Sequence, residues 1–297
     1  MPTSIRGFIQ RHPALSYYVI TFLISWGGVL LVIAPTGLHA TSEQFAKLFP
    51  LAVMAMVTGP ITAGIFLTWV VYGQPGLRDF GARLVRARVA ARWYAIALLL
   101  APLYFIATAL LVALAYRSTD YLPALFVASD KVAVLVQGIA VGLAAGIVEE
   151  LGWTGFAVPT LRRRHSVFAT GLIAGVLWGA WHFLVKIWGA ENAGIVDYTA
   201  IDLASAVIGL TGYRILMVWV YDRTHSLFIA ILMHLALTFS TLALQPLVTG
   251  ERLIVAGVPL TVAPWLIIAA AIVVRRTRPG GRSDRSFPSS TETPILT

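Results

Sequence analysis

The chain has 297 residues, of which 58% are hydrophobic and only 12% are charged. Soluble domains carry about 25% charged residues, so this composition, with a mean hydropathy of +0.82, excludes an ordinary soluble protein and indicates an integral membrane protein. The absence of cysteine excludes disulfides, thiolate metal sites and a cysteine nucleophile. No aromatic and basic face accompanies the net charge of +9, so we expect no nucleic-acid partner.

Membrane-spanning helices need about 20 mostly apolar residues. This rule predicts eight spans: Leu15–Pro35, Leu51–Val71, Trp93–Tyr116, Val132–Leu151, Val167–Trp188, Ile201–Val220, Ser226–Leu244 and Val255–Val274. The first is too long for a signal peptide and lacks a small-x-small cleavage site. We therefore predict an all-α polytopic membrane protein: one helical domain over residues 1–276 with a conical or bundle-like cavity open to the cytoplasm. Residues 277–297, rich in Gly, Pro, Ser and Thr, predict a disordered cytoplasmic tail.

Arginines gather in alternate loops. They precede the first span, follow the second, fourth and eighth spans, and comprise Arg6, Arg11, Arg78, Arg83, Arg86, Arg88, Arg92, Arg162, Arg163, Arg164, Arg275, Arg276 and Arg278. The positive-inside rule places these loops and both termini in the cytoplasm, which indicates a multi-pass protein of the cell membrane. Residues 77–92 among them fit either an amphipathic helix on anionic lipid or an ordinary charged loop.

Ionisable residues away from the span ends are few: Glu149, Glu150, His182, Arg214 and His234. Such groups are expensive inside a membrane and are functional candidates by default. The apolar stretch that carries the glutamates, 132–161, would be about 45 Å long as one helix. Because this exceeds a hydrocarbon core of about 30 Å, we expect it to tilt or to break near Gly152, Gly155 or Pro159.

Small residues predict which way these side chains face. Gly142 and Gly146 share one helical face with both glutamates. In the same way Gly171, Gly175 and Gly179 lead to His182, and Trp178 lies one turn before it. Since stripes of small residues mark close helix approach in membranes, we expect the glutamates and His182 to point into the bundle.

Two chemistries fit this set. Two adjacent carboxylates cannot both ionise cheaply in a poorly solvated site, so one becomes available as a general base; with imidazole donors for an oxyanion this suits amide hydrolysis. Alternatively Glu149, His182 and His234 would hold a divalent metal such as zinc. The sequence contains neither HExxH nor G-x-S-x-G, so the commonest zinc protease and serine hydrolase arrangements are not indicated.

Three motifs resemble those of the CPBP family of intramembrane proteases, which includes the CAAX prenyl endopeptidase. They are "EELGWT" with Glu149 and Glu150, "WGAWH" with Trp178 and His182, and "HLALT" with His234. The resemblance covers about 132–244. It implies that Glu149 activates water with help from Glu150, that the two histidines bind water or the oxyanion, and that the substrate is a membrane-embedded or lipidated, possibly prenylated, peptide.

This chain departs from the family pattern at two positions. Thr154 stands where the motif has arginine, and Thr238 where it has asparagine. We hypothesise that Arg214, the only arginine within a span, supplies the missing positive charge, so that Arg214→Met inactivates the protein without unfolding it.

Two alternatives stay open: a non-catalytic immunity or scaffold protein of the same family, which the two threonines motivate, and a proton-coupled transporter using the glutamates.

Overall fold

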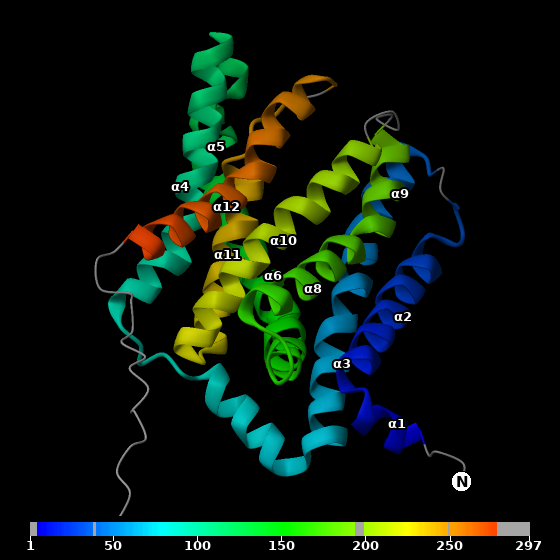
Figure 1. Cartoon of the computed structure of the whole chain (residues 1–297). Helices are drawn as coiled ribbons and strands as arrows, with labels where there is room; N and C mark the ends of the chain where they lie inside the picture. The colour runs from blue at the N-terminus through cyan, green and yellow to red at the C-terminus, as the bar shows by residue number, and fades with distance from the viewer. Residues whose placement is uncertain (1–4, 38–39, 194–198, 249, 278–297) are drawn as a thin grey trace, which may run out of the picture.

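The computed structural model describes residues 5–37, 40–193, 199–248 and 250–277, and over these ranges it contains helices and no strand (Figure 1). The predicted tail beyond Thr277 lies outside the described residues. The long helices are α2 (Pro13–Ile33), α3 (Ser42–Leu84), α4 (Ala91–Tyr116), α6 (Lys131–Gly152), α8 (Val167–Trp181), α10 (Thr199–Thr224), α11 (Leu227–Ala243) and α12 (Arg252–Thr277). The short elements are α1 (Ile5–Arg11), η1 (Thr119–Tyr121), α5 (Ala124–Val127), the π-helical turn η2 (Trp153–Ala157), α7 (Val158–Arg162) and α9 (Phe183–Ala193).

Seven helical stretches of the described chain are long and apolar enough to cross a membrane, and α11 is a shorter apolar helix of 17 residues. Each of the eight predicted spans coincides with one of these. Large apolar side chains such as Leu31 and Leu114, 79% and 75% exposed, cover the outer surface, as expected of a surface in contact with lipid. The prediction of an all-α multi-pass membrane protein is confirmed.

The helices that carry the ionisable residues lie in the middle of the molecule. Figure 1 shows α6, α8, α10 and α11 together, with α2 and α3 on one side and α4 and α12 on the other. The most extensive packing joins α8 to α10 and α6 to α11. Helices α6 and α8 are the two whose glycine stripes predicted close approach to a neighbouring helix.

The predicted break in the fourth span takes the form of η2. It follows Gly152 directly and contains Gly155. Helix α7 follows it without a gap and has Pro159 in its first turn. The helical path thus continues to Arg162 with one wider turn instead of a sharp bend. Such π-turns place side chains off the α-helical register and are frequent at functional sites.

Side-chain caps define where three central helices begin. Asp130, Ser166 and Ser226 accept hydrogen bonds from backbone N–H groups in the first turns of α6, α8 and α11, at 2.9, 3.2 and 3.1 Å. Short polar residues at this position satisfy N–H groups that have no partner within the helix. The caps therefore fix the register of the elements that carry the glutamates and both inward histidines.

Helix α3 runs beyond its predicted end. At Gly73 the backbone has φ 62° and ψ −156°, a conformation that glycine adopts without strain. The helix then continues to Leu84, so the helical interpretation of residues 77–92 holds for the part up to Leu84. Phe80 in this arm is 8% exposed and therefore packs against protein.

We predict that Gly142→Ala destabilises the protein, because an added Cβ would lie 2.8 Å from the Leu235 carbonyl oxygen of α11. Overpacking of this kind costs about 1–3 kcal/mol. Gly257→Ala is the matched control, since nothing lies within 4 Å of its added Cβ and alanine favours a helix by up to about 1 kcal/mol. Thermal unfolding in detergent measures both variants. An equal rise of the two midpoints would contradict the close packing of α6 and α11.

Candidate active site

Glu149 and Glu150 lie in the last turn of α6, and both side chains point into the bundle. They are 5% and 0% exposed. The glycine face of α6 explains this, because Gly142 and Gly146 press against the backbone of α11 so closely that an added Cβ would lie 2.8 Å from a carbonyl oxygen. The face that touches α11 is thus the one that carries the carboxylates.

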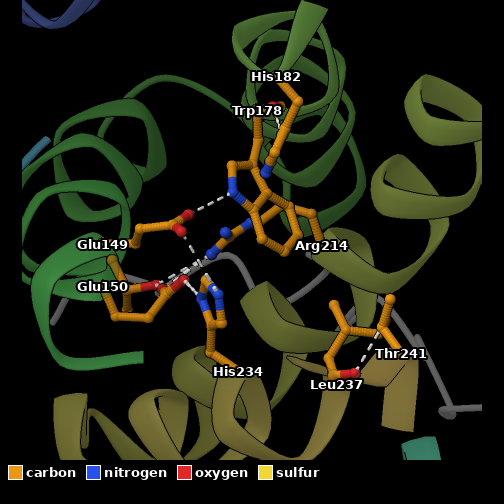
Figure 2. A network of polar contacts seen from close by, with 9 residues as sticks. Glu149, Glu150, Trp178, His182, Arg214, His234, Leu237 and Thr241 are labelled. Atoms are coloured by element: carbon orange, nitrogen blue, oxygen red, sulfur yellow. Dashed lines mark hydrogen bonds and ion pairs between the residues drawn. The ribbon is translucent and has the colours of Figure 1, made fainter. Parts of the chain in front are cut away.

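Glu150 is surrounded by hydrogen-bond donors from three other elements, α10, α11 and η2 (Figure 2). Arg214 Nη1 of α10 donates to its Oε2 at 2.8 Å, and both side chains are fully buried. His234 Nδ1 of α11 lies 2.7 Å from its Oε1, and the Thr154 hydroxyl of η2 donates to Oε2. Because a carboxylate paired with arginine only accepts, the His234 proton sits on Nδ1. Both oxygens of Glu150 are therefore occupied.

Glu149 has one occupied oxygen and one that is open. Its Oε2 accepts the indole N–H of Trp178 at 2.8 Å. Its Oε1 faces His234 Nε2 at 3.9 Å, which is too long for a hydrogen bond but short enough for one water molecule to bridge. The two adjacent carboxylates thus have different surroundings, and Glu149 is the one with a free acceptor.

Trp178 and His182 come from the end of α8. The glycine stripe of α8 packs on α10, where an added Cβ at Gly175 would lie 2.5 Å from Thr211 Cα, and this turns Trp178 inward. His182 closes α8, and its Nδ1 lies 2.8 Å from the Trp178 carbonyl oxygen. The imidazole therefore donates from Nδ1 and leaves Nε2 free. In Figure 2 its ring lies next to Trp178 and apart from Glu150 and His234.

Arg214 is held by stacking as well as by charge. Its Cζ lies 3.9 Å from the centre of the Trp178 ring, a cation–π contact that is strong when desolvated. Arg214 thus lies between Trp178 and Glu150 and provides the positive charge that the sequence led us to expect beside the glutamates. Its Nε and Nη2 are buried and meet no acceptor among the described residues.

The two departures from the family pattern have different outcomes. Thr154 joins the network directly and lies 3.5 Å from Arg214 Nη1. Thr238 is half-buried, one turn after His234, and takes no part in the polar network of the described residues. Thr241, three residues after Thr238, donates to the Leu237 carbonyl oxygen of its own helix at 3.1 Å (Figure 2).

The residues proposed for a metal, Glu149, His182 and His234, do not converge. Across the described part of the chain no three His, Asp or Glu side chains are arranged to hold a metal ion. The Arg214 guanidinium already neutralises Glu150 and would repel a second cation at this distance. The donor set therefore does not fit a divalent metal such as zinc.

The network is enclosed in this conformation. Exposure is 5% for Glu149, 2% for His234 and 0% for Arg214. These side chains are thus enclosed by protein in this conformation.

Comparison with known proteins bears on the same part of the chain. A family model described as type II CAAX prenyl endopeptidase Rce1-like matches residues 131–240. The chain is also similar to a protein named CAAX prenyl protease 2 from Methanococcus maripaludis, with 25% identity over 159 residues, or 53% of this chain and 51% of the relative. It therefore spans about half the length of the curated relative it matches. The glutamates, Trp178, His182, Arg214 and His234 all fall within the range of the family model.

We predict that Arg214→Met lowers the stability of the protein as well as its function. The hypothesis drawn from the sequence expected a loss of function without unfolding. It leaves the fully buried Glu150 without its cation, and removing one partner of a buried pair costs about 3–5 kcal/mol. The double variant Arg214→Met/Glu150→Gln removes both charges and is expected to unfold closer to the parent protein.

Arg252→Met is the control for this experiment, because its ion pair with Asp120 is 59% and 50% exposed and such pairs contribute about 0–1 kcal/mol. Thermal midpoints in detergent compare the three variants with the parent. If Arg214→Met unfolds no earlier than Arg252→Met, Arg214 does not neutralise Glu150.

Proposed function

We propose that the chain is an intramembrane endopeptidase of the CPBP family, because the Rce1-like family model matches residues 131–240, the range that carries the three motifs. Its substrates are membrane-associated peptides, with a C-terminal prenylated segment of the CAAX type as the leading class. The observation that carries the proposal is the asymmetry of the glutamates: Glu150 is saturated by Arg214, His234 and Thr154, whereas Glu149 keeps a free oxygen opposite His234.

Water is the nucleophile in the proposed reaction. A water molecule in the 3.9 Å gap between Glu149 Oε1 and His234 Nε2 donates to both, and Glu149 removes its proton. The resulting hydroxide adds to the scissile carbonyl carbon. As the C–N bond breaks, Glu149 returns the proton to the leaving nitrogen, so that peptide and water yield a carboxylic acid and an amine.

The remaining residues position these groups and favour the charge that develops. Trp178 orients Glu149 through its indole N–H, and Glu150 orients His234 through Nδ1. In His182 and His234 the Nδ1 hydrogens are engaged, so Nε2 is the nitrogen that faces a substrate. Arg214 adds a fixed positive charge to this buried network, and in the proposed reaction that charge favours the developing oxyanion, since charges act most strongly where bulk water is excluded.

The proposed location is the cell membrane, with both termini and the reactive end of the bundle in the cytoplasm. Contacts among three of the arginine-rich segments support this. Arg11 and Arg164 line one surface pocket, and Arg83 donates to the Gly155 carbonyl oxygen, which lies in the same helical stretch that leads to Arg164. By the positive-inside rule this end is cytoplasmic.

We predict that Glu149→Gln lowers cleavage by about 10²–10⁴-fold, the usual contribution of a general base. The amide oxygen of glutamine still accepts the Trp178 N–H, so the thermal midpoint is expected to stay near that of the parent. Glu43→Gln is the matched control, since Glu43 is an exposed carboxylate paired only with Lys47. The assay reconstitutes each protein in liposomes with a prenylated C-terminal peptide and follows product release by mass spectrometry.

Membrane peptides of cells expressing the parent or Glu149→Gln protein provide the unbiased version of this assay. Peptides that disappear only with the parent identify substrates. Retained binding without cleavage by either form would indicate a scaffold, and proton-linked uptake by the liposomes would indicate a transporter; both results contradict the proposal.

A further inference from the structure

The arm of α3 that follows Gly73 (residues 74–84, hereafter the α3 arm) packs on the π-turn η2. Phe80 of the arm covers Gly155, where an added Cβ would lie 2.5 Å from the Phe80 ring. Just before the arm, the Tyr72 hydroxyl lies 3.2 Å from that of Thr160. The contact between Phe80 and η2 is possible because residue 155 is a glycine without a side chain.

Arg83 makes the polar part of this contact. Its Nη1 donates to the Gly155 carbonyl oxygen at 3.0 Å and to the Tyr221 hydroxyl at 2.8 Å. Its Nε donates to Asp79 on the same arm at 2.8 Å. The side chain is only 11% exposed, whereas that of Asp79 is 67% exposed. A largely buried arginine with three acceptors is not a loop charge that serves membrane topology alone.

Pro159 removes one backbone donor from this part of the chain. In an α-helix the Gly155 carbonyl would accept the backbone N–H of the residue four positions later, which is Pro159, and proline has no N–H to donate. Arg83 donates to this carbonyl oxygen from another element of the fold.

Two of the three acceptors of Arg83, the Gly155 carbonyl and the Tyr221 hydroxyl, lie on η2 and α10, which both contact Glu150. Gly155 follows Thr154 in η2, and Tyr221 lies seven residues, about two turns, after Arg214 in α10. The contact of Arg83 with both elements is therefore a second cross-link parallel to the buried pair of Arg214 and Glu150.

From this geometry we propose that Arg83 is a positioning residue of the active site. It holds η2 against α10, so that the Thr154 hydroxyl and Arg214 stay on the Glu150 carboxylate and Glu149 keeps its orientation toward His234. This inference rests on the proposed peptidase function for its effect on rate, but not for its effect on the conformation of η2.

The experiment compares Arg83→Met, Arg83→Lys and the control Arg78→Met. Arg78 lies on the same arm but is exposed, so its loss removes equal charge without the contact. Lysine keeps the charge but lacks the planar fork that reaches two acceptors at once, so Arg83→Lys is expected to be intermediate.

The first readout, hydrogen–deuterium exchange in detergent, needs no substrate. We expect Arg83→Met to speed exchange at the amides of residues 153–158 while α4 and α12 exchange as in the parent. Exchange at parent rates in 153–158, or faster exchange throughout the molecule, would overturn the positioning role.

The second readout is cleavage of the liposome substrate. Small misplacement of a catalytic group costs up to roughly 100-fold in rate, so we expect kcat of Arg83→Met to fall by about 10- to 100-fold with KM nearly unchanged, and Arg78→Met to match the parent. Equal kcat for the two variants would overturn the positioning role. If the parent itself cleaves nothing, the peptidase proposal fails, and the exchange readout alone decides the role of Arg83.

Discussion

The carboxylate of Glu150 is the constraint on which the centre of this protein depends. A charge with no solvent exposure is tolerated only where it is paired and fully hydrogen bonded. Here the partners are Arg214 of α10, His234 of α11 and Thr154 of η2. Any shift of one of these elements along its axis would leave a buried charge or donor without a partner. The pair thus selects one register for the whole central group of helices.

Small residues make this convergence possible. The glycine stripes of α6 and α8 let their backbones approach α11 and α10 so closely that a single methyl group would meet neighbouring backbone. At that separation the short side chain of Glu150 reaches two other helices directly. Close packing and the polar network therefore support each other, because larger residues in the stripes would move the donors out of hydrogen-bond range.

The same closeness gives two adjacent carboxylates different surroundings. Both oxygens of Glu150 are hydrogen bonded, whereas Glu149 meets one indole N–H and faces an imidazole nitrogen across 3.9 Å. In the proposed reaction this difference in environment, and not the residue type, makes Glu149 the general base. The cation at Glu150 is Arg214 of α10, whereas the family motif has its arginine at position 154. In this chain Thr154 occupies that position and donates its hydroxyl to Glu150.

The sequence by itself determined the class of protein, the positions of the spans and the inward faces of the glutamates, because hydropathy and helical periodicity are local properties. It also identified Arg214 as the cation available within the membrane. Only the tertiary structure decided that Arg214 pairs with Glu150 and not with Glu149, that His182 binds the Trp178 carbonyl, and that Arg83 reaches Gly155. Residues 149 and 150 differ by about 100° around one helix, so the partner of each depends on how three other helices pack. No local pattern in the chain carries that information.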